Sequence, residues 1–73
     1  MGRFELLHAF AAKHINGKAR INLSLPSLQA RGYDTQELED LVRNYERLDS
    51  GHRRYAFILD NSTLSIARCM RSE

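Results

Sequence analysis

One segment constrains the fold more than any other, because residues 34–49, DTQELEDLVRNYERLD, have the hydrophobic spacing of an amphipathic helix. Apolar side chains recur at i, i+3, i+4, i+7 and i+10, which places them along one side of a helix with 3.6 residues per turn. These side chains are Leu38, Leu41, Val42, Tyr45 and Leu48. Such a continuous apolar stripe must be buried, so the pattern predicts a helix that packs against a core.

The opposite side of this predicted helix is acidic. The segment holds six of the nine carboxylates of the chain and two arginines, whereas the whole chain has a net charge of +2. The carboxylates are Asp34, Glu37, Glu39, Asp40, Glu46 and Asp49. Asp34 or Thr35 has the position of a helix cap, and Glu39 with Arg43 has the i, i+4 spacing of a helical ion pair. The remaining chain is therefore basic, which predicts a dipolar surface or, alternatively, solvated faces that only maintain solubility.

Length and composition limit the chain to one small domain over residues 1–73. A chain of this size buries only about 60% of the surface that its unfolded form exposes, so we expect a thin core. Its single cysteine, Cys69, excludes an internal disulfide and suggests a reducing, cytoplasmic compartment. No apolar run approaches the roughly 18 residues that span a bilayer, and no signal-peptide cleavage pattern follows the first apolar segment. We expect neither membrane insertion nor secretion.

The other segments alternate between helical and strand patterns. The predicted elements are a largely buried helix over Arg3–Ile15, a strand over Arg20–Leu25, a short helix over Pro26–Arg31, the acidic helix, and two strands over Arg54–Leu59 and Thr63–Cys69. The last two strands are close enough in sequence to form a β-hairpin around Asn61. The sequence therefore predicts an α+β fold with the order α-β-α-α-β-β and a C-terminal β-hairpin.

This order resembles the winged-helix form of the helix-turn-helix domain over nearly the whole chain. The resemblance places the helix-turn-helix across Leu28–Leu48, with Gly32 in the turn, and makes the hairpin around Asn61 the wing. It implies a small winged-helix-like domain.

A second family offers an alternative fold. The sequence RINLSLP, followed by a helix, resembles the strand of ribbon-helix-helix dimers. That family requires a full helix after Leu25, and Pro26–Gly32 is too short to supply one. The helix predicted over Arg3–Ile15 also has no place in the ribbon-helix-helix pattern.

The charge of the acidic helix argues against sequence-specific DNA binding by this helix in the major groove. Major-groove readers need Arg, Lys, Asn or Gln at the start of the recognition helix, but this helix starts with Gln36, Glu37, Glu39 and Asp40. Carboxylates that face phosphates cost affinity. Two functional classes remain, namely a protein-binding adaptor and a small winged-helix DNA-binding repressor that uses its basic hairpin. Charge complementarity with basic or mixed protein surfaces favours the adaptor.

A 73-residue chain with one basic, helix-turn-helix-like domain and no enzymatic motif is similar to the very short transcription regulators of lytic bacteriophages, in particular those of phages that infect Xanthomonas. The resemblance implies a regulator that binds RNA polymerase in the host bacterial cytoplasm and inhibits sigma-dependent promoter recognition, with a further effect on termination. Protein is then the main partner and nucleic acid a secondary one, and the chain is a monomer or weak dimer. No motif aligns, so no functional residue is carried over.

The residues for which we predict partner contacts form a basic and an acidic group. Arg53 and Arg54 make the densest basic cluster, and Arg68 would lie near them if the hairpin turn is tight. The predicted partner-binding residues are Arg53, Arg54, Tyr55, Arg68, Glu37 and Asp40. Arginine and tyrosine are enriched at interface centres, although charges on an edge strand also serve to prevent aggregation.

No pattern in the chain indicates catalysis, a metal or a cofactor. His8 and His14 are six residues apart, His52 is distant from both, and no cysteine pair has zinc-site spacing. Cys69 is more typical of a small buried residue than of a nucleophile. We therefore expect no enzymatic activity, no metal and no cofactor. Among the aromatic side chains, we expect Tyr33 to be exposed in a turn.

Overall fold

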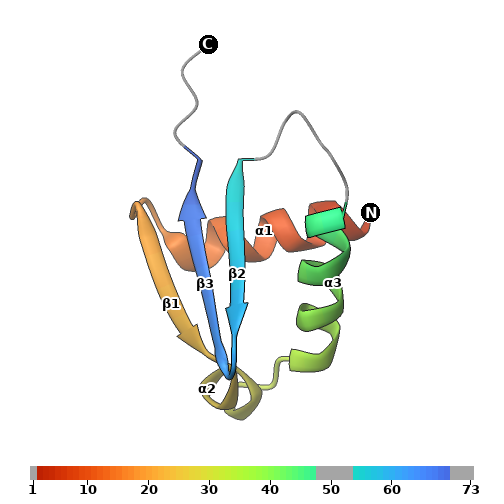
Figure 1. Cartoon of the computed structure of the whole chain (residues 1–73). Helices are drawn as coiled ribbons and strands as arrows, with labels where there is room; N and C mark the ends of the chain where they lie inside the picture. Colours follow the sequence, from red (N-terminus) through yellow and green to blue (C-terminus); the bar gives the residue numbers. More distant parts are fainter. Residues whose placement is uncertain (1, 48–53, 70–73) are drawn as a thin grey trace.

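The computed structural model describes residues 2–47 and 54–69, with the side chains of residues 46 and 47 left undescribed (Figure 1). In this part of the chain it is an α+β fold with three helices and a three-stranded antiparallel sheet. The elements are α1 (Arg3–Ile15), β1 (Arg20–Ser24), α2 (Leu25–Ala30), α3 (Thr35–Arg47), β2 (Tyr55–Asp60) and β3 (Thr63–Arg68). The element order predicted from the sequence is confirmed. Leu48, Asp49, His52 and Arg53 lie outside the described residues.

The sheet has the strand order β1-β3-β2, so the central strand is the last one in sequence. β2 and β3 form the predicted hairpin, with Tyr55 opposite Arg68 at one end and Asp60 opposite Thr63 at the other. The turn between them includes Asn61, which adopts a left-handed φ of 56° that asparagine tolerates better than most residues. β1 then pairs with the far side of β3, from Arg20 opposite Ala67 to Ser24 opposite Thr63.

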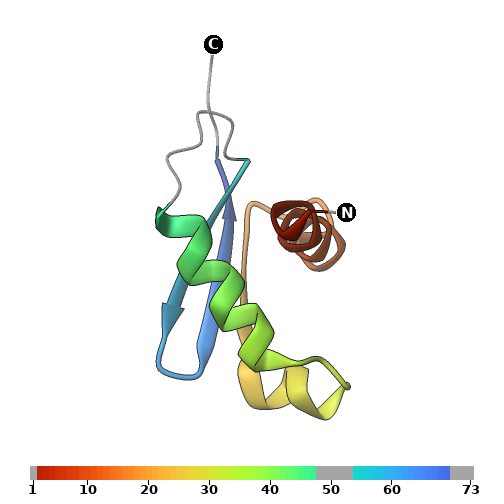
Figure 2. The same ribbon diagram turned by 90° about the vertical axis from the view of Figure 1, so that its right-hand side faces the viewer.

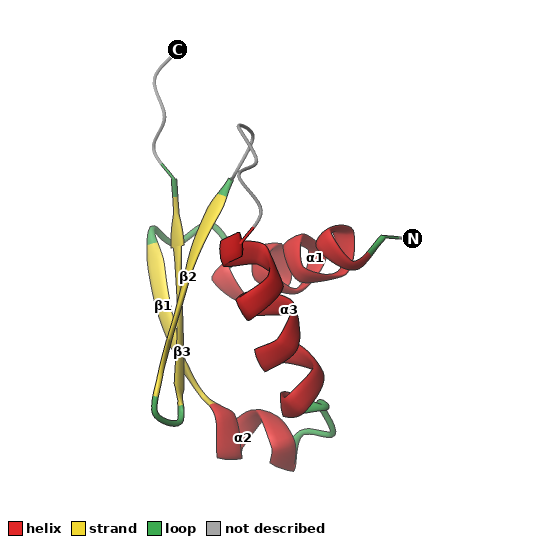
Figure 3. Cartoon of the chain, turned by 45° about the vertical axis from the view of Figure 1, so that its right-hand side comes forward, coloured by secondary structure: helices red, strands yellow, loops and turns green. Residues whose placement is uncertain are grey.

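The helices lie on one face of the sheet, and the core fills the space between them (Figures 2 and 3). The core side chains are Leu7, Ala11 and Ile15 from α1, Leu25 and Leu28 from α2, Leu38, Leu41, Val42 and Tyr45 from α3, and Phe57, Leu64 and Ile66 from the sheet. No described helix covers the other face, where Ile58 is 61% exposed. Among the described residues, no helix combines the length and the apolar character needed to cross a membrane.

The first helix is less buried than its composition predicts. Only Leu7, Ala11 and Ile15 are buried, whereas Phe4 and Leu6 are among the exposed large hydrophobic side chains. The buried residues are spaced four apart and therefore form one stripe, which is all that a helix packed on one side can bury. The expectation of a largely buried helix was wrong for this reason.

Four predicted strand boundaries were also wrong, each by one residue. The first strand ends at Ser24, because the Ser24 Oγ accepts a hydrogen bond from the Ser27 N–H (3.5 Å) and so caps α2. Leu25 consequently begins α2, and Pro26 lies in its first turn, where no backbone N–H is needed. The second strand runs over Tyr55–Asp60 rather than Arg54–Leu59, and the last strand ends at Arg68 rather than at Cys69.

Candidate functional site

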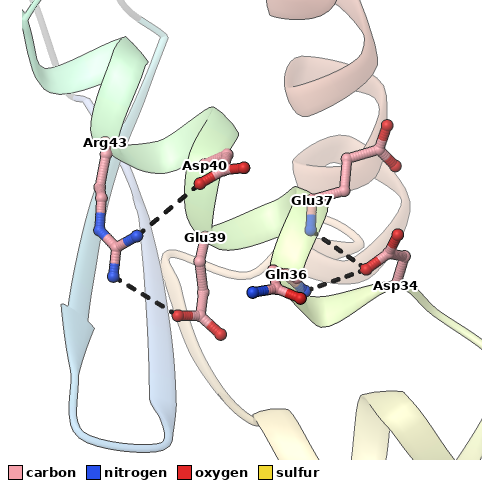
Figure 4. Close-up of polar contacts among 6 residues, drawn as sticks. All are labelled: Asp34, Gln36, Glu37, Glu39, Asp40 and Arg43. Atoms are coloured by element: carbon pink, nitrogen blue, oxygen red, sulfur yellow. Dashed lines mark hydrogen bonds and ion pairs between the residues drawn. The ribbon is translucent and has the colours of Figure 1, made fainter.

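The start of α3 carries the acidic surface. Asp34 caps the helix, because its Oδ1 accepts hydrogen bonds from the backbone N–H groups of Gln36 (3.1 Å) and Glu37 (3.2 Å) (Figure 4). This confirms the predicted position of the cap. The carboxylate of Asp34 is therefore engaged by the helix end, where the dipole also favours negative charge.

Further along the helix, Arg43 offsets part of this charge. One guanidinium nitrogen lies 3.6 Å from the Glu39 Oε1 and the other lies 3.7 Å from the Asp40 Oδ1 (Figure 4). The predicted ion pair between Glu39 and Arg43 is confirmed. The Asp40 side chain is still 58% exposed, and Glu37 is exposed without an ion pair to any described residue. Both residues predicted to bind a partner on this helix therefore face solvent.

The predicted basic group lies at the other end of the molecule. Arg68 stands opposite Tyr55 in the hairpin, and the Cys69 N–H donates to the Arg54 carbonyl oxygen (2.9 Å), so the backbones of Arg54 and Arg68 are close, as predicted. Both arginines are exposed. Tyr55 is half-buried, and its ring centroid lies 5.7 Å from that of His8, so it offers less surface to a partner than the arginines do.

Two further cations belong to this group and were missed by sequence reasoning. The Arg68 N–H donates to the Ala19 carbonyl oxygen (2.9 Å), which brings the neighbouring residues Lys18 and Arg20 to the same end of the sheet. Nothing local in the sequence indicates this, because it depends on the pairing of β1 with β3. We call the four exposed cations Lys18, Arg20, Arg54 and Arg68 the basic end.

The hairpin separates the basic end from the acidic surface. Asp60 lies five residues along β2 from Tyr55, about 17 Å at the usual rise per residue of a strand. The hairpin turn is held against α2 by the Leu25 N–H, which donates to the Ser62 carbonyl oxygen (2.8 Å), and α3 starts shortly after α2 (Figure 1). The arginines and the hairpin tip therefore lie at opposite ends of the hairpin and do not form one basic surface.

A histidine and two tyrosines connect α1, α3 and β2 beside the basic end. The Tyr45 Oη donates its proton to the Tyr55 carbonyl oxygen (3.2 Å), so the His8 Nε2 has to donate to the Tyr45 Oη (3.3 Å). Burial, and to a lesser extent the positive charge of Arg54, lower the pKa of His8 from its ordinary value. The contacts place a proton on the His8 Nε2, and the lowered pKa favours the neutral form of the ring.

A second aromatic group corrects the expectation for Tyr33. This side chain is half-buried, and its ring meets those of Phe10 and His14 with centroid distances of 5.4 Å each. The Lys13 Nζ also donates to the Tyr33 Oη (3.4 Å). Tyr33 is therefore a packing residue between α1 and the turn before α3, and it was wrongly expected to be exposed.

The described residues contain no group of three or more His, Cys, Asp or Glu side chains that could hold a metal ion. Comparison of the chain with protein-family models, curated proteins and solved structures gave no significant match. The two charged surfaces of the described residues are the acidic start of α3 and the basic end.

Proposed function

We propose that this chain is a small transcription regulator that binds bacterial RNA polymerase through a protein–protein interface and inhibits sigma-dependent promoter recognition. The observation that carries the proposal is the exposed acidic surface at the start of α3, with Glu37 and Asp40 at its centre. A surface of this charge favours encounter with a basic or mixed protein surface.

As part of the same proposal, we assign the fold to the winged-helix class. The strand order β1-β3-β2 supports the assignment, and so does the short α2, which is followed by a turn at Gly32 with φ 100° and then by α3. In this arrangement α3 takes the position of the DNA-reading helix. Duplex DNA carries one negative charge per about 1.7 Å of its axis, so the carboxylates of α3 would repel it.

The acidity of the hairpin tip further favours a protein partner over an operator. A repressor that docked both α3 and the tip on a duplex would bring Asp60 and Glu37 toward phosphates, at a cost in affinity. The resemblance to short phage regulators suggests RNA polymerase as the partner. It also suggests the cytoplasm of the host bacterium as the compartment in which the two proteins meet. In this proposal the chain occupies a polymerase surface that promoter recognition by the sigma-containing enzyme requires, and it also alters termination.

Purified RNA polymerase, with and without sigma factor, tests the proposal directly. The variant Glu37→Gln/Asp40→Asn should bind about tenfold more weakly than the wild-type chain, because it removes charge from the centre of the acidic surface. Glu5→Gln/Glu73→Gln is the matched control, since it changes the net charge equally outside α3 and the hairpin tip. Labelled chain and fluorescence anisotropy give both affinities.

Run-off transcription from a sigma-dependent promoter completes the test. The wild-type chain and the control variant should inhibit the first round of synthesis, and Glu37→Gln/Asp40→Asn should inhibit it less at equal concentration. Absence of binding to either form of the polymerase would refute the proposed partner. An equal loss of affinity in both variants would show that α3 is not part of the interface.

A further inference from the structure

Hydrogen-bonded strand ends bring the backbones of the four residues of the basic end to one end of the sheet, from three segments of the chain. The Arg68 N–H donates to the carbonyl oxygen of Ala19, whose two neighbours are Lys18 and Arg20 (2.9 Å). On the other side of β3, the Cys69 N–H donates to the carbonyl oxygen of Arg54 (2.9 Å). The sheet therefore sets the spacing of these backbones, and strand alternation places Arg68 on the helix-facing side of β3 and Arg20 on the other face of the sheet.

This concentration of charge has no counter-charge in the described part of the chain. All four side chains are exposed, and none of them forms an ion pair with a described carboxylate. Asp60 lies at the other end of β2, about 17 Å from Tyr55. That separation exceeds the Debye length of about 8 Å at physiological ionic strength, so Asp60 does not compensate the basic end.

We propose that the basic end binds the phosphate backbone of nucleic acid without regard to sequence. Protein interfaces need apolar or aromatic anchors at their centre. None of the exposed large hydrophobic side chains of the described residues lies on the strand ends that carry the cations, since Phe4 and Leu6 are on α1 and Ile58 is in the middle of β2. A row of phosphates needs only cations at a suitable spacing, which these strand ends supply.

The position of the basic end differs from that of a wing contact. A wing touches DNA with the tip of its hairpin, but here the tip carries Asp60 and the cations lie at the opposite end. The acidic start of α3 is also near the tip, so a strand of nucleic acid on the basic end does not have to approach those carboxylates. The inference does not depend on the proposed polymerase partner, because the isolated chain can be tested.

Fluorescence anisotropy with a labelled single-stranded RNA and a labelled DNA duplex, both of mixed sequence, tests the inference. Four neutralised phosphates predict slopes of log affinity against log salt of about −3 for a single strand and about −4 for duplex DNA. Between 50 and 200 mM KCl the affinity should therefore fall about 50- to 150-fold. The arm with the higher affinity identifies whether a single strand or a duplex supplies the phosphates.

Charge reversal at the basic end should abolish most of this binding. Arg20→Glu/Arg68→Glu is compared with Arg3→Glu/Arg31→Glu, which has the same net charge but changes exposed arginines outside the basic end. The first variant should lose at least about tenfold in affinity at 50 mM KCl, and the second less than about threefold. Lys18→Glu/Arg54→Glu repeats the test outside the regular strands, in case the strand substitutions prevent folding.

Three results would overturn the inference. The first is an equal loss of affinity in the two matched variants, which would show that only net charge matters. The second is binding that does not weaken with salt. The third is that polyglutamate displaces both labelled nucleic acids at a lower concentration than unlabelled nucleic acid of equal charge does. That result would show that the basic end binds an acidic protein segment in preference to nucleic acid.

Discussion

At the scale of single residues, His8 is the side chain whose chemistry is most constrained by its surroundings. Its Nε2 donates to the Tyr45 Oη, and its ring lies edge-on to those of Tyr45 and Tyr55, with centroid distances of 5.5 and 5.7 Å. Protonation would place a second positive charge beside Arg54 in a partly buried position. Burial and Arg54 together lower the pKa of His8, so folding favours the neutral form.

This constraint predicts that the chain loses stability in mild acid. Because the folded state has the lower pKa, the unfolded state binds more protons below its pKa of about 6.5, and the free energy of unfolding falls as the pH decreases through that value. Above it both states are neutral and His8 contributes no pH dependence. The variant His8→Gln should reduce the difference between urea midpoints measured at pH 7.5 and pH 5.5. His14→Gln, which leaves the contacts of His8 in place, should retain it, and an unchanged difference in His8→Gln would contradict the assignment.

The burial of a residue was predicted correctly where a local sequence pattern determines it. It was predicted wrongly where contacts with residues distant in sequence determine it. Tyr45 was predicted to be buried because it belongs to a helical stripe, and it is 3% exposed. Tyr33 was predicted to be exposed because it follows a glycine in a turn. Its actual partners, Phe10 and His14, are about twenty residues away on α1, and no local pattern indicates them.

At the scale of elements, the helices were predicted well because their ends are encoded locally. The bounds of α1 are those predicted, since Asn16 and Gly17 at its end both adopt left-handed conformations, with φ values of 47° and 82°. The start of α3 was found from Asp34. The placement of β1 beside β3 could not be predicted in this way, because it depends on pairing between Arg20 and Ala67, which are far apart in sequence.

The cap of α3 gives a prediction at this scale. Asp34→Ala removes the acceptor for the N–H groups of Gln36 and Glu37, and it should lower the free energy of unfolding by about 1 kcal/mol. Asp34→Asn retains an acceptor oxygen and should cost much less. Urea unfolding followed by circular dichroism measures both variants. If the two lose equal stability, the charge of Asp34 rather than its hydrogen bonds stabilises the helix.

At the scale of the whole molecule, the fold places the acidic surface and the basic end apart in space. Along the sequence, only the acidic residues form one continuous segment. The acidic segment was evident from the sequence, and its predicted residues Glu37 and Asp40 are exposed. Only part of the basic end was predicted, since Lys18 and Arg20 join Arg54 and Arg68 only after β1 pairs with β3. The pairing of β2 with β3 places Arg54 and Arg68 at one end of the sheet and the hairpin tip at the other, although these residues are close in sequence.

Removing a positive charge should have opposite effects on stability in the two charged regions. It should stabilise the fold in the basic end and destabilise it on α3. Two cations about 10 Å apart repel each other by about 0.4 kcal/mol in water, before screening. Arg68→Gln should therefore raise the free energy of unfolding by about 0.5 kcal/mol at low ionic strength. Arg43→Gln removes the ion pairs with Glu39 and Asp40 and should lower it by about 0.5 kcal/mol, as expected for exposed pairs.

Salt separates this electrostatic effect from any change in packing. At 1 M NaCl the Debye length falls to about 3 Å, so both differences from the wild-type chain should shrink toward zero. Thermal or urea unfolding at low and high salt measures the four differences. A loss of stability in both variants at low salt would mean that the cations of the basic end are neutralised by residues outside the described part of the chain. In that case the basic end would no longer present four uncompensated charges to a phosphate backbone.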